Sequence, residues 1–151
     1  ALSASDLEKL HLVFMQQVIA PMRLALADRL IEKHRAAGDR LLVITSTNRF
    51  IVEPICQSLG LNEILATVPE MVDGHYTGKI IGIPTYKEGK VERLDLWLRA
   101  NNESMKGSYF YSDSINDMPL LLKVANPVAV DPDPELRLEA LNRDWEIISL
   151  R

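Results

Sequence analysis

The sequence predicts an α/β fold with a largely parallel sheet and flanking helices. Apolar runs such as residues 41–44 are continuous instead of alternating, which is typical of strands buried on both faces. Amphipathic segments of about ten residues or more separate these runs, as βαβ units require. The length of 151 residues, with 47% hydrophobic and 25% charged residues, indicates one globular domain.

Two helices are expected before the first strand. Apolar residues recur at three- and four-residue steps over residues 7–18, which predicts an amphipathic helix. Pro21 suits the first turn of a second helix, and Gly38 suits its end. We expect this second helix to bury Met22, Leu26, Leu30 and Ile31. The segment 1–21 is therefore predicted to be a helical region distinct from an α/β body over residues 22–151.

The remaining elements alternate between strands and helices. In chain order we expect a strand at 41–44, a helix at 49–59, a strand at 65–68, a hairpin arm around Asp73-Gly74 and Thr77-Gly78, a helix at 89–100, a strand at 108–111, a helix at 116–124, a strand at 127–130, a helix begun by Asp133-Pro134, and a strand at 145–150. Cys56 lies on an apolar helix face and is predicted to be a packed thiol.

Composition excludes several classes of function. The net charge of −4 and the pI of 5.4 lack the basic footprint of a nucleic-acid binder. The apolar runs are too short to cross a bilayer, so we expect neither a nucleic-acid nor a membrane partner. A single cysteine excludes an internal disulfide and a zinc ribbon, and it fits a reducing, cytoplasmic location. Glycine-rich phosphate loops, HExxH and GxSxG are all missing from the sequence.

Two polar clusters follow predicted strands, at residues 45–48 and 112–117. Ligands of open α/β sheets bind beyond the carboxyl ends of the strands, so these clusters are the candidate site. Asp113 and Asp117 are four residues apart, and two such carboxylates repel each other unless a cation or a proton intervenes. Mg²⁺ prefers oxygen ligands of this kind, with a phosphate as co-ligand. Alternatively, Asp113 caps the following helix and Asp117 complements its dipole.

Three further side chains are candidates for phosphate binding. Thr45 and its neighbour Ser46 could donate hydrogen bonds to phosphoryl oxygens, or Thr45 could satisfy the free amides of the next helix. Lys90 is a cation at a helix start, where the helix dipole favours an anion. That placement suits a lysine that faces a bound anion, although most single lysines are solvated surface residues.

Three segments in order resemble motifs of the haloacid dehalogenase (HAD) superfamily of phosphatases. They are LLVIT at 41–45, GKV at 89–91 and YSDSIND at 111–117, which are similar to the second, third and fourth motifs of that superfamily. The phosphoserine-phosphatase-like branch, with a small helical cap and a GDSxND fourth motif, is the most similar. The resemblance begins at about residue 22 and continues to the last residue.

The resemblance implies a Rossmann-like HAD core and a role for each motif residue. Thr45 and Ser46 would bind the phosphoryl oxygens, Lys90 would offset negative charge, Asp113 and Asp117 would hold Mg²⁺, and Asn116 would support the metal site. The implied substrate is a small phosphorylated metabolite. Ser112 stands where the family usually has glycine, a change that we do not expect to disable the loop.

One motif of the family is missing from these 151 residues. DxDxT supplies the aspartate that becomes phosphorylated and the aspartate that acts as general acid and base. Its strand lies, in the family, between the strands that end at Thr45 and Ser112, so we expect those two strands not to pair directly. The chain is thus expected to be part of a longer phosphatase, with residues 1–21 as the end of its cap. Alone, it is expected to be inactive, and poorly soluble or oligomeric.

Two alternatives remain open from the sequence. One is a non-catalytic Rossmann-like binding or regulatory module, and the other is a phosphotransferase of the same family. The presence of Thr45, Lys90, Asp113 and Asp117 favours an enzyme, because a module without chemistry has no need of two close carboxylates.

Overall fold

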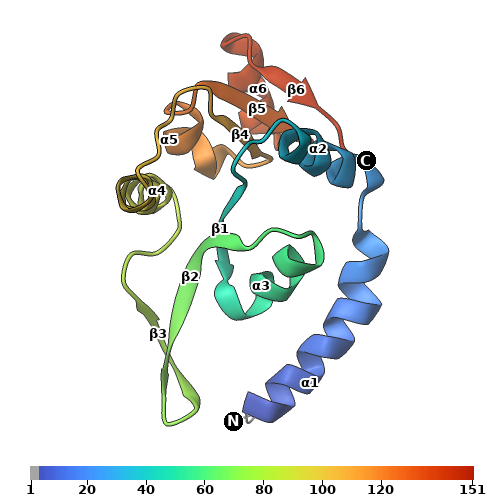
Figure 1. Ribbon diagram of the computed structural model, residues 1–151, viewed down its shortest axis with the longest axis vertical. Coiled ribbons are helices and arrows are strands. Elements are labelled where there is room, and N and C mark those ends of the chain that lie inside the picture. The colour runs from blue at the N-terminus through green and yellow to red at the C-terminus, as the bar shows by residue number, and fades with distance from the viewer. Residues whose placement is uncertain (1–3) are drawn as a thin grey trace. The chain divides into compact units, whose positions relative to one another are not determined.

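The computed structural model describes residues 4–151, which form the helices and strands shown in Figure 1. The chain divides into two compact units, Ala1–Thr85 and Tyr86–Arg151. Each unit contains a three-stranded sheet, with the order β1-β2-β3 in the first and β4-β5-β6 in the second. Three of the four strand pairings are parallel, so the predicted α/β fold with a largely parallel sheet is confirmed.

The first unit contains a βαβ unit extended by a hairpin. β1 (Leu42–Asn48) pairs in parallel with β2 (Glu63–Val72), and α3 (Arg49–Ser58) connects the two strands. β1 extends beyond the predicted strand because Thr45 pairs with Ala66, and Asn48 pairs with Thr67 after a register shift. The polar cluster expected after the strand therefore forms its last residues. The buried core residues Cys56, Ile64 and Ala66 pack here, so the prediction of a packed thiol is confirmed.

The predicted hairpin arm is formed by β2 and β3 (His75–Ile81), which pair antiparallel. The two residues between them, Asp73 and Gly74, have φ of 49° and 78°. Two central residues with positive φ are the signature of a type I′ turn, whose twist matches that of the flanking strands. Every residue of β3 is exposed.

The N-terminal helices differ in part from the prediction. α1 (Ala4–Phe14) continues into a π-helical turn, η1 (Met15–Ile19), and a 3₁₀ turn, η2 (Ala20–Met22). α2 (Ala25–Ala36) starts later than predicted, because the backbone becomes extended at Arg23 and Leu24; Pro21 therefore lies in η2.

The predicted buried face of the second helix is only half right. Met22 and Leu26 are 67% and 41% exposed, whereas Leu30 and Ile31 are partly buried. Met22 lies before the break in the helix, so the regular spacing that would place it on the same face does not apply. Gly38 follows α2 with φ of 81°, which confirms the predicted end of the helix.

The predicted boundary at residue 21, between a cap segment and the core, stays a prediction. Among the described residues, no single helix has the length and apolar character needed to cross a membrane; only the bent pair Ser5–Met22 and Ala25–Ala36, with an angle of 89°, meets those two criteria together.

The second unit begins with α4 (Glu88–Asn101), followed by the parallel sheet. Its strands are β4 (Tyr109–Ser112), β5 (Asn126–Val130) and β6 (Glu146–Ile148), and α6 (Pro134–Asn142) connects the last two. Leu121, Ala129, Leu136 and Ala140 form its buried core. The helix expected at 116–124 is instead a 3₁₀ turn, η3 (Ile115–Asp117), and the short α5 (Met118–Leu121). Pro119, in the first turn of α5, favours this break because it lacks the N–H that a continuous helix would use.

Each three-stranded sheet has two edge strands in the described chain, and β1 and β4 are among them. Within residues 4–151, β1 pairs only with β2, and β4 pairs only with β5. The expectation that the strands ending at Thr45 and Ser112 do not pair directly is therefore confirmed.

Candidate active site

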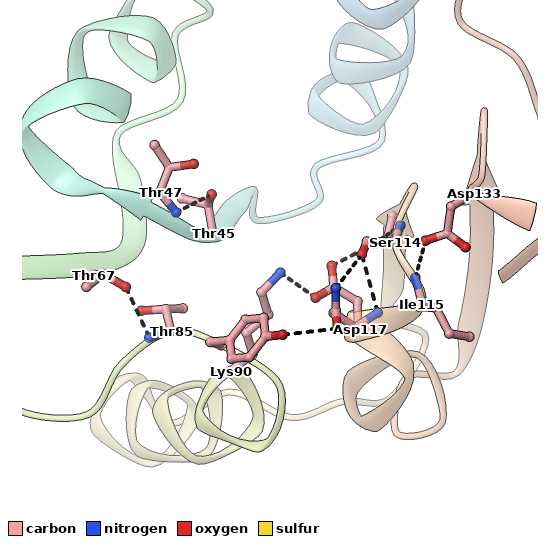
Figure 2. Close-up of polar contacts among 12 residues, drawn as sticks. Thr45, Thr47, Thr67, Thr85, Lys90, Ser114, Ile115, Asp117 and Asp133 are labelled. Carbon is pink, nitrogen blue, oxygen red and sulfur yellow. Dashed lines mark hydrogen bonds and ion pairs between the residues drawn. The ribbon is translucent and has the colours of Figure 1, made fainter. Parts of the chain in front are cut away.

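Lys90 lies in the first turn of α4 and is almost completely buried, with 7% exposure. Its Nζ is 2.6 Å from Oδ1 of Asp117 (Figure 2). The same Nζ lies 6.0 Å from the centre of the Phe110 ring. Lys87 is the N-cap of the helix, and its φ of 47° changes the direction of the chain there. The Lys90 amide donates to the Lys87 carbonyl at 3.0 Å. The turn before α4 thus turns Lys90 inward, and the interpretation of Lys90 as a solvated surface residue is wrong.

Asp117 is the partner of Lys90 and is equally buried, with 7% exposure. Its second oxygen, Oδ2, accepts a hydrogen bond from the Ser112 hydroxyl at 2.7 Å. Both carboxylate oxygens are therefore engaged. A buried ion pair is tolerated only when such contacts offset the loss of hydration.

The loop between β4 and α5 is held by Asp133. Its Oδ2 accepts from the Ile115 amide at 2.8 Å (Figure 2), and its Oδ1 accepts from the Leu136 amide at 2.7 Å. The Asp133 amide in turn donates to the Asp113 carbonyl at 2.8 Å. Asp133 is the predicted cap of α6, which is confirmed. Its second contact, with the loop, was not predicted, because nothing local in the sequence indicates it.

Tyr86 and Asn116 form a second contact between the start of α4 and this loop. The Tyr86 hydroxyl donates to Oδ1 of Asn116 at 3.1 Å, and Asn116 Nδ2 donates to the Ser114 hydroxyl at 3.2 Å. Asn116 is thus held in place from both ends of its amide. Tyr86 was not predicted, because its position shortly before Lys90 is all that distinguishes it in the sequence.

Asp113 is exposed, and its carboxylate has no hydrogen bond or ion pair within residues 4–151. Its carboxylate is the one in the loop that is available to a cation. The part of the chain that the structure describes contains no group of three or more His, Cys, Asp or Glu side chains suited to a metal. Mg²⁺ needs only one or two carboxylates when phosphate oxygens and water complete its shell, so Asp113 fits such a site. The role of Asp117 as a second ligand stays a prediction.

Thr45 and Ser46 belong to the first unit and lie within β1, with Thr45 at its centre. The Thr45 hydroxyl accepts from the Thr47 amide at 3.1 Å, and Ser46 is exposed. The alternative, that Thr45 caps the following helix, is wrong, because Asn48 accepts the Phe50 amide at 2.8 Å and caps α3 itself. The predicted phosphate contacts of Thr45 and Ser46 stay predictions.

A buried lysine–aspartate pair beside an exposed carboxylate, where a parallel strand ends, is an arrangement suited to a phosphate and its counter-ion. Residues 2–122 match the model of the haloacid dehalogenase-like hydrolases, and the chain belongs to this family. Its 37% identity to a relative named phosphoserine phosphatase supports the branch indicated by the sequence.

Particular relatives are named phosphatases. The chain is 43% identical over 153 aligned positions to a histidinol-phosphatase of Neisseria meningitidis serogroup C, covering 99% of this chain and 69% of that protein. It is 37% identical to the phosphoserine phosphatase SerB1 of Mycobacterium tuberculosis, covering 81% of this chain and 40% of that protein. The chain thus spans about two thirds of the first relative and less than half of the second.

Solved structures support the same fold. A protein of unknown function from Bordetella pertussis Tohama I superposes with a TM-score of 0.95 at 42% identity, covering 99% of this chain and 69% of that one. A substrate-bound phosphoserine phosphatase gives a TM-score of 0.65 at 21% identity, covering 83% and 57%, which shows the fold alone.

Proposed function

We propose that the chain is the major part of a Mg²⁺-dependent phosphatase that hydrolyses the phosphomonoester of a small metabolite through an aspartyl-phosphate intermediate. The observation that carries the proposal is the buried ammonium of Lys90. An ammonium has three N–H donors, and Asp117 Oδ1 is the single acceptor that faces it within residues 4–151. Buried donors require partners, so the remaining donors are available to an anion such as a phosphoryl group.

The proposed roles follow from the position of each group. Lys90 offsets the negative charge of the phosphoryl group, and Asp117 holds Lys90. Asp113, whose carboxylate is exposed, binds Mg²⁺, and Asn116 supports that loop. Thr45 and Ser46 donate to phosphoryl oxygens. The nucleophile and the general acid–base come from a DxDxT strand outside these residues. Mg²⁺ supplies charge neutralisation.

The relatives point to the substrate class. We propose L-histidinol phosphate as the first substrate to test, because the relative named histidinol-phosphatase aligns with 99% of the chain. Phosphoserine is the second, from the relatives named phosphoserine phosphatases. Both are phosphomonoesters of a primary alcohol next to a carbon that bears an amino group, and we propose a cytoplasmic location for the enzyme.

The test is reconstitution followed by a phosphate-release assay. The chain is expressed alone and together with a DxDxT-containing segment from a relative, and each preparation is analysed by size-exclusion chromatography. We expect the chain alone to be inactive and oligomeric or poorly soluble. The pair should be soluble and hydrolyse p-nitrophenyl phosphate and one of the two metabolites with Mg²⁺. Activity of the chain alone, as a folded monomer, would contradict the proposal.

A Lys90→Met variant supplies the mechanistic control. Loss of one preorganised donor to a developing charge typically lowers kcat about 10²–10³-fold. Replacement of Lys123, the exposed partner of Asp95, should leave kcat unchanged. A pair that binds vanadate without turnover would instead support the non-catalytic module. Phosphate transfer to an added alcohol in place of water would support the phosphotransferase.

A further inference from the structure

Ser112 is the last residue of β4 and has only 7% exposure, although it is polar. We propose that Ser112 is a positioning residue that fixes the Asp117 carboxylate and, through it, the ammonium of Lys90. The inference rests on the proposed phosphatase function and adds a residue at a position where the family usually has glycine. Ser112 itself acts on Asp117 and does not need to touch the substrate.

The direction of the hydrogen bonds follows from the chemistry of the groups. The Ser112 hydroxyl has one hydrogen to donate and can accept two. It accepts from the Ser114 amide at 3.2 Å, since an amide can only donate. A carboxylate can only accept, so the single hydroxyl hydrogen goes to Asp117 Oδ2, 2.7 Å away. The contact with Ser114 thus orients the hydroxyl toward Asp117.

The two oxygens of Asp117 are then fixed by different donors. Ser112 holds Oδ2 at 2.7 Å and Lys90 holds Oδ1 at 2.6 Å, which sets the plane of the carboxylate. A carboxylate held at one oxygen can rotate about its terminal torsion, for which the preference is broad. Without the hydroxyl, Oδ2 would be a buried acceptor without a partner, and rotation would carry Oδ1 away from Lys90. The Lys90 side chain would then lose the contact that orients it.

Removal of the hydroxyl is sterically simple. Ser112 is not among the residues with positive φ, and its strand pairing with Ala129 uses only the backbone. Both Ser112→Ala and Ser112→Gly therefore remove the hydrogen bond without backbone strain. The matched control is Ser108→Ala, at the partly buried serine just before β4. Its hydroxyl donates to the Met105 carbonyl at 2.7 Å and has no contact with Asp117.

The experiment uses the chain expressed together with the DxDxT segment and two readouts. The first is the exchange of the Lys90 ammonium hydrogens with water, measured by ¹⁵N NMR and assigned by the loss of its signal in Lys90→Met. The second is the separation of kcat from KM in the phosphate-release assay. We expect exchange at least about tenfold faster and kcat about tenfold lower in Ser112→Ala and Ser112→Gly, since hydrogen bonds to charged groups are strong. KM should change little, and Ser108→Ala should change neither readout.

The outcomes separate this proposal from the proposed function. The proposal for Ser112 would be refuted if the Lys90 hydrogens exchange at the same rate in both Ser112 variants as in the unmodified chain. It would also be refuted if both variants have the kcat of Ser108→Ala at the same thermal stability. If the pair of chains proves to have no phosphatase activity, the exchange measurement still decides whether Ser112 orients Lys90. Faster exchange in the Ser112 variants, without any phosphatase activity, would thus refute the proposed phosphatase function and support the role of Ser112.

Discussion

Replacement of Asp117 by asparagine should strongly destabilise the second unit. The variant keeps the shape of the side chain but leaves the Lys90 ammonium, 7% exposed and 2.6 Å away, without an opposite charge. Breaking a buried ion pair on one side costs about 3–5 kcal/mol. The amide oxygen can still accept from Lys90, so we expect a value near the lower limit, about 3 kcal/mol. For a chain of this size that corresponds to a fall in Tm of roughly 6–12 °C.

The assay is urea unfolding at fixed concentration of the chain and the DxDxT segment, with Asp95→Asn as the matched control. Asp95 and Lys123 form an ion pair with the same separation of 2.6 Å, but both side chains are 35% exposed. An exposed pair contributes about 1 kcal/mol at most, so the control should change the free energy of unfolding only slightly. Adding Lys90→Met to Asp117→Asn should restore part of the loss. Equal effects of the two asparagine variants would refute the argument that burial makes the Lys90 pair important.

Three further predictions concern single residues. Burial raises the pKa of the Cys56 thiol, with a smaller contribution from Glu53. Cys56 should therefore react with a disulfide reagent at least about tenfold more slowly in the native protein than in urea. Equal rates would show that the reagent reaches Cys56 in the folded state. Hydrogen bonds from Ser149 and then from the Leu150 amide lower the pKa of Asp131, so its contribution to stability is present above its ordinary pKa of 3.8 and is lost as the pH falls below that value. Asp131→Asn should therefore reduce the loss of stability on acidification, which urea unfolding between pH 6 and about pH 3 would measure. Asp133→Ala removes the cap of α6 and the contact with Ile115, so it should lower the free energy of unfolding by about 1–2 kcal/mol in the same assay. A decrease below about 0.5 kcal/mol would show that water replaces both hydrogen bonds.

Local signals in the sequence determined most of the secondary structure. The hairpin followed from Asp73-Gly74, because few residues adopt two successive positive φ angles. The start of α6 followed from Asp133 before Pro134, because an aspartate side chain can accept from a free amide of the first turn, here that of Leu136, while proline has no amide hydrogen to satisfy. Lys90 stood out for a comparable reason, as a cation at the positive end of a helix. Each of these signals acts within a few residues, so the chain carries it without reference to the fold.

Contacts between distant segments were decided only by the tertiary structure. Ser112, Lys90 and Asp117 meet because β4 ends beside the first turn of α4, and no spacing in the sequence specifies that approach. Burial behaved in the same way: helical spacing placed Met22 on an apolar face, but an extended backbone interrupts the helix and leaves this side chain exposed. Hydrogen-bond partners and burial depend on which surfaces pack together. That is a property of the whole chain, since the free energy of packing is shared among segments far apart in sequence.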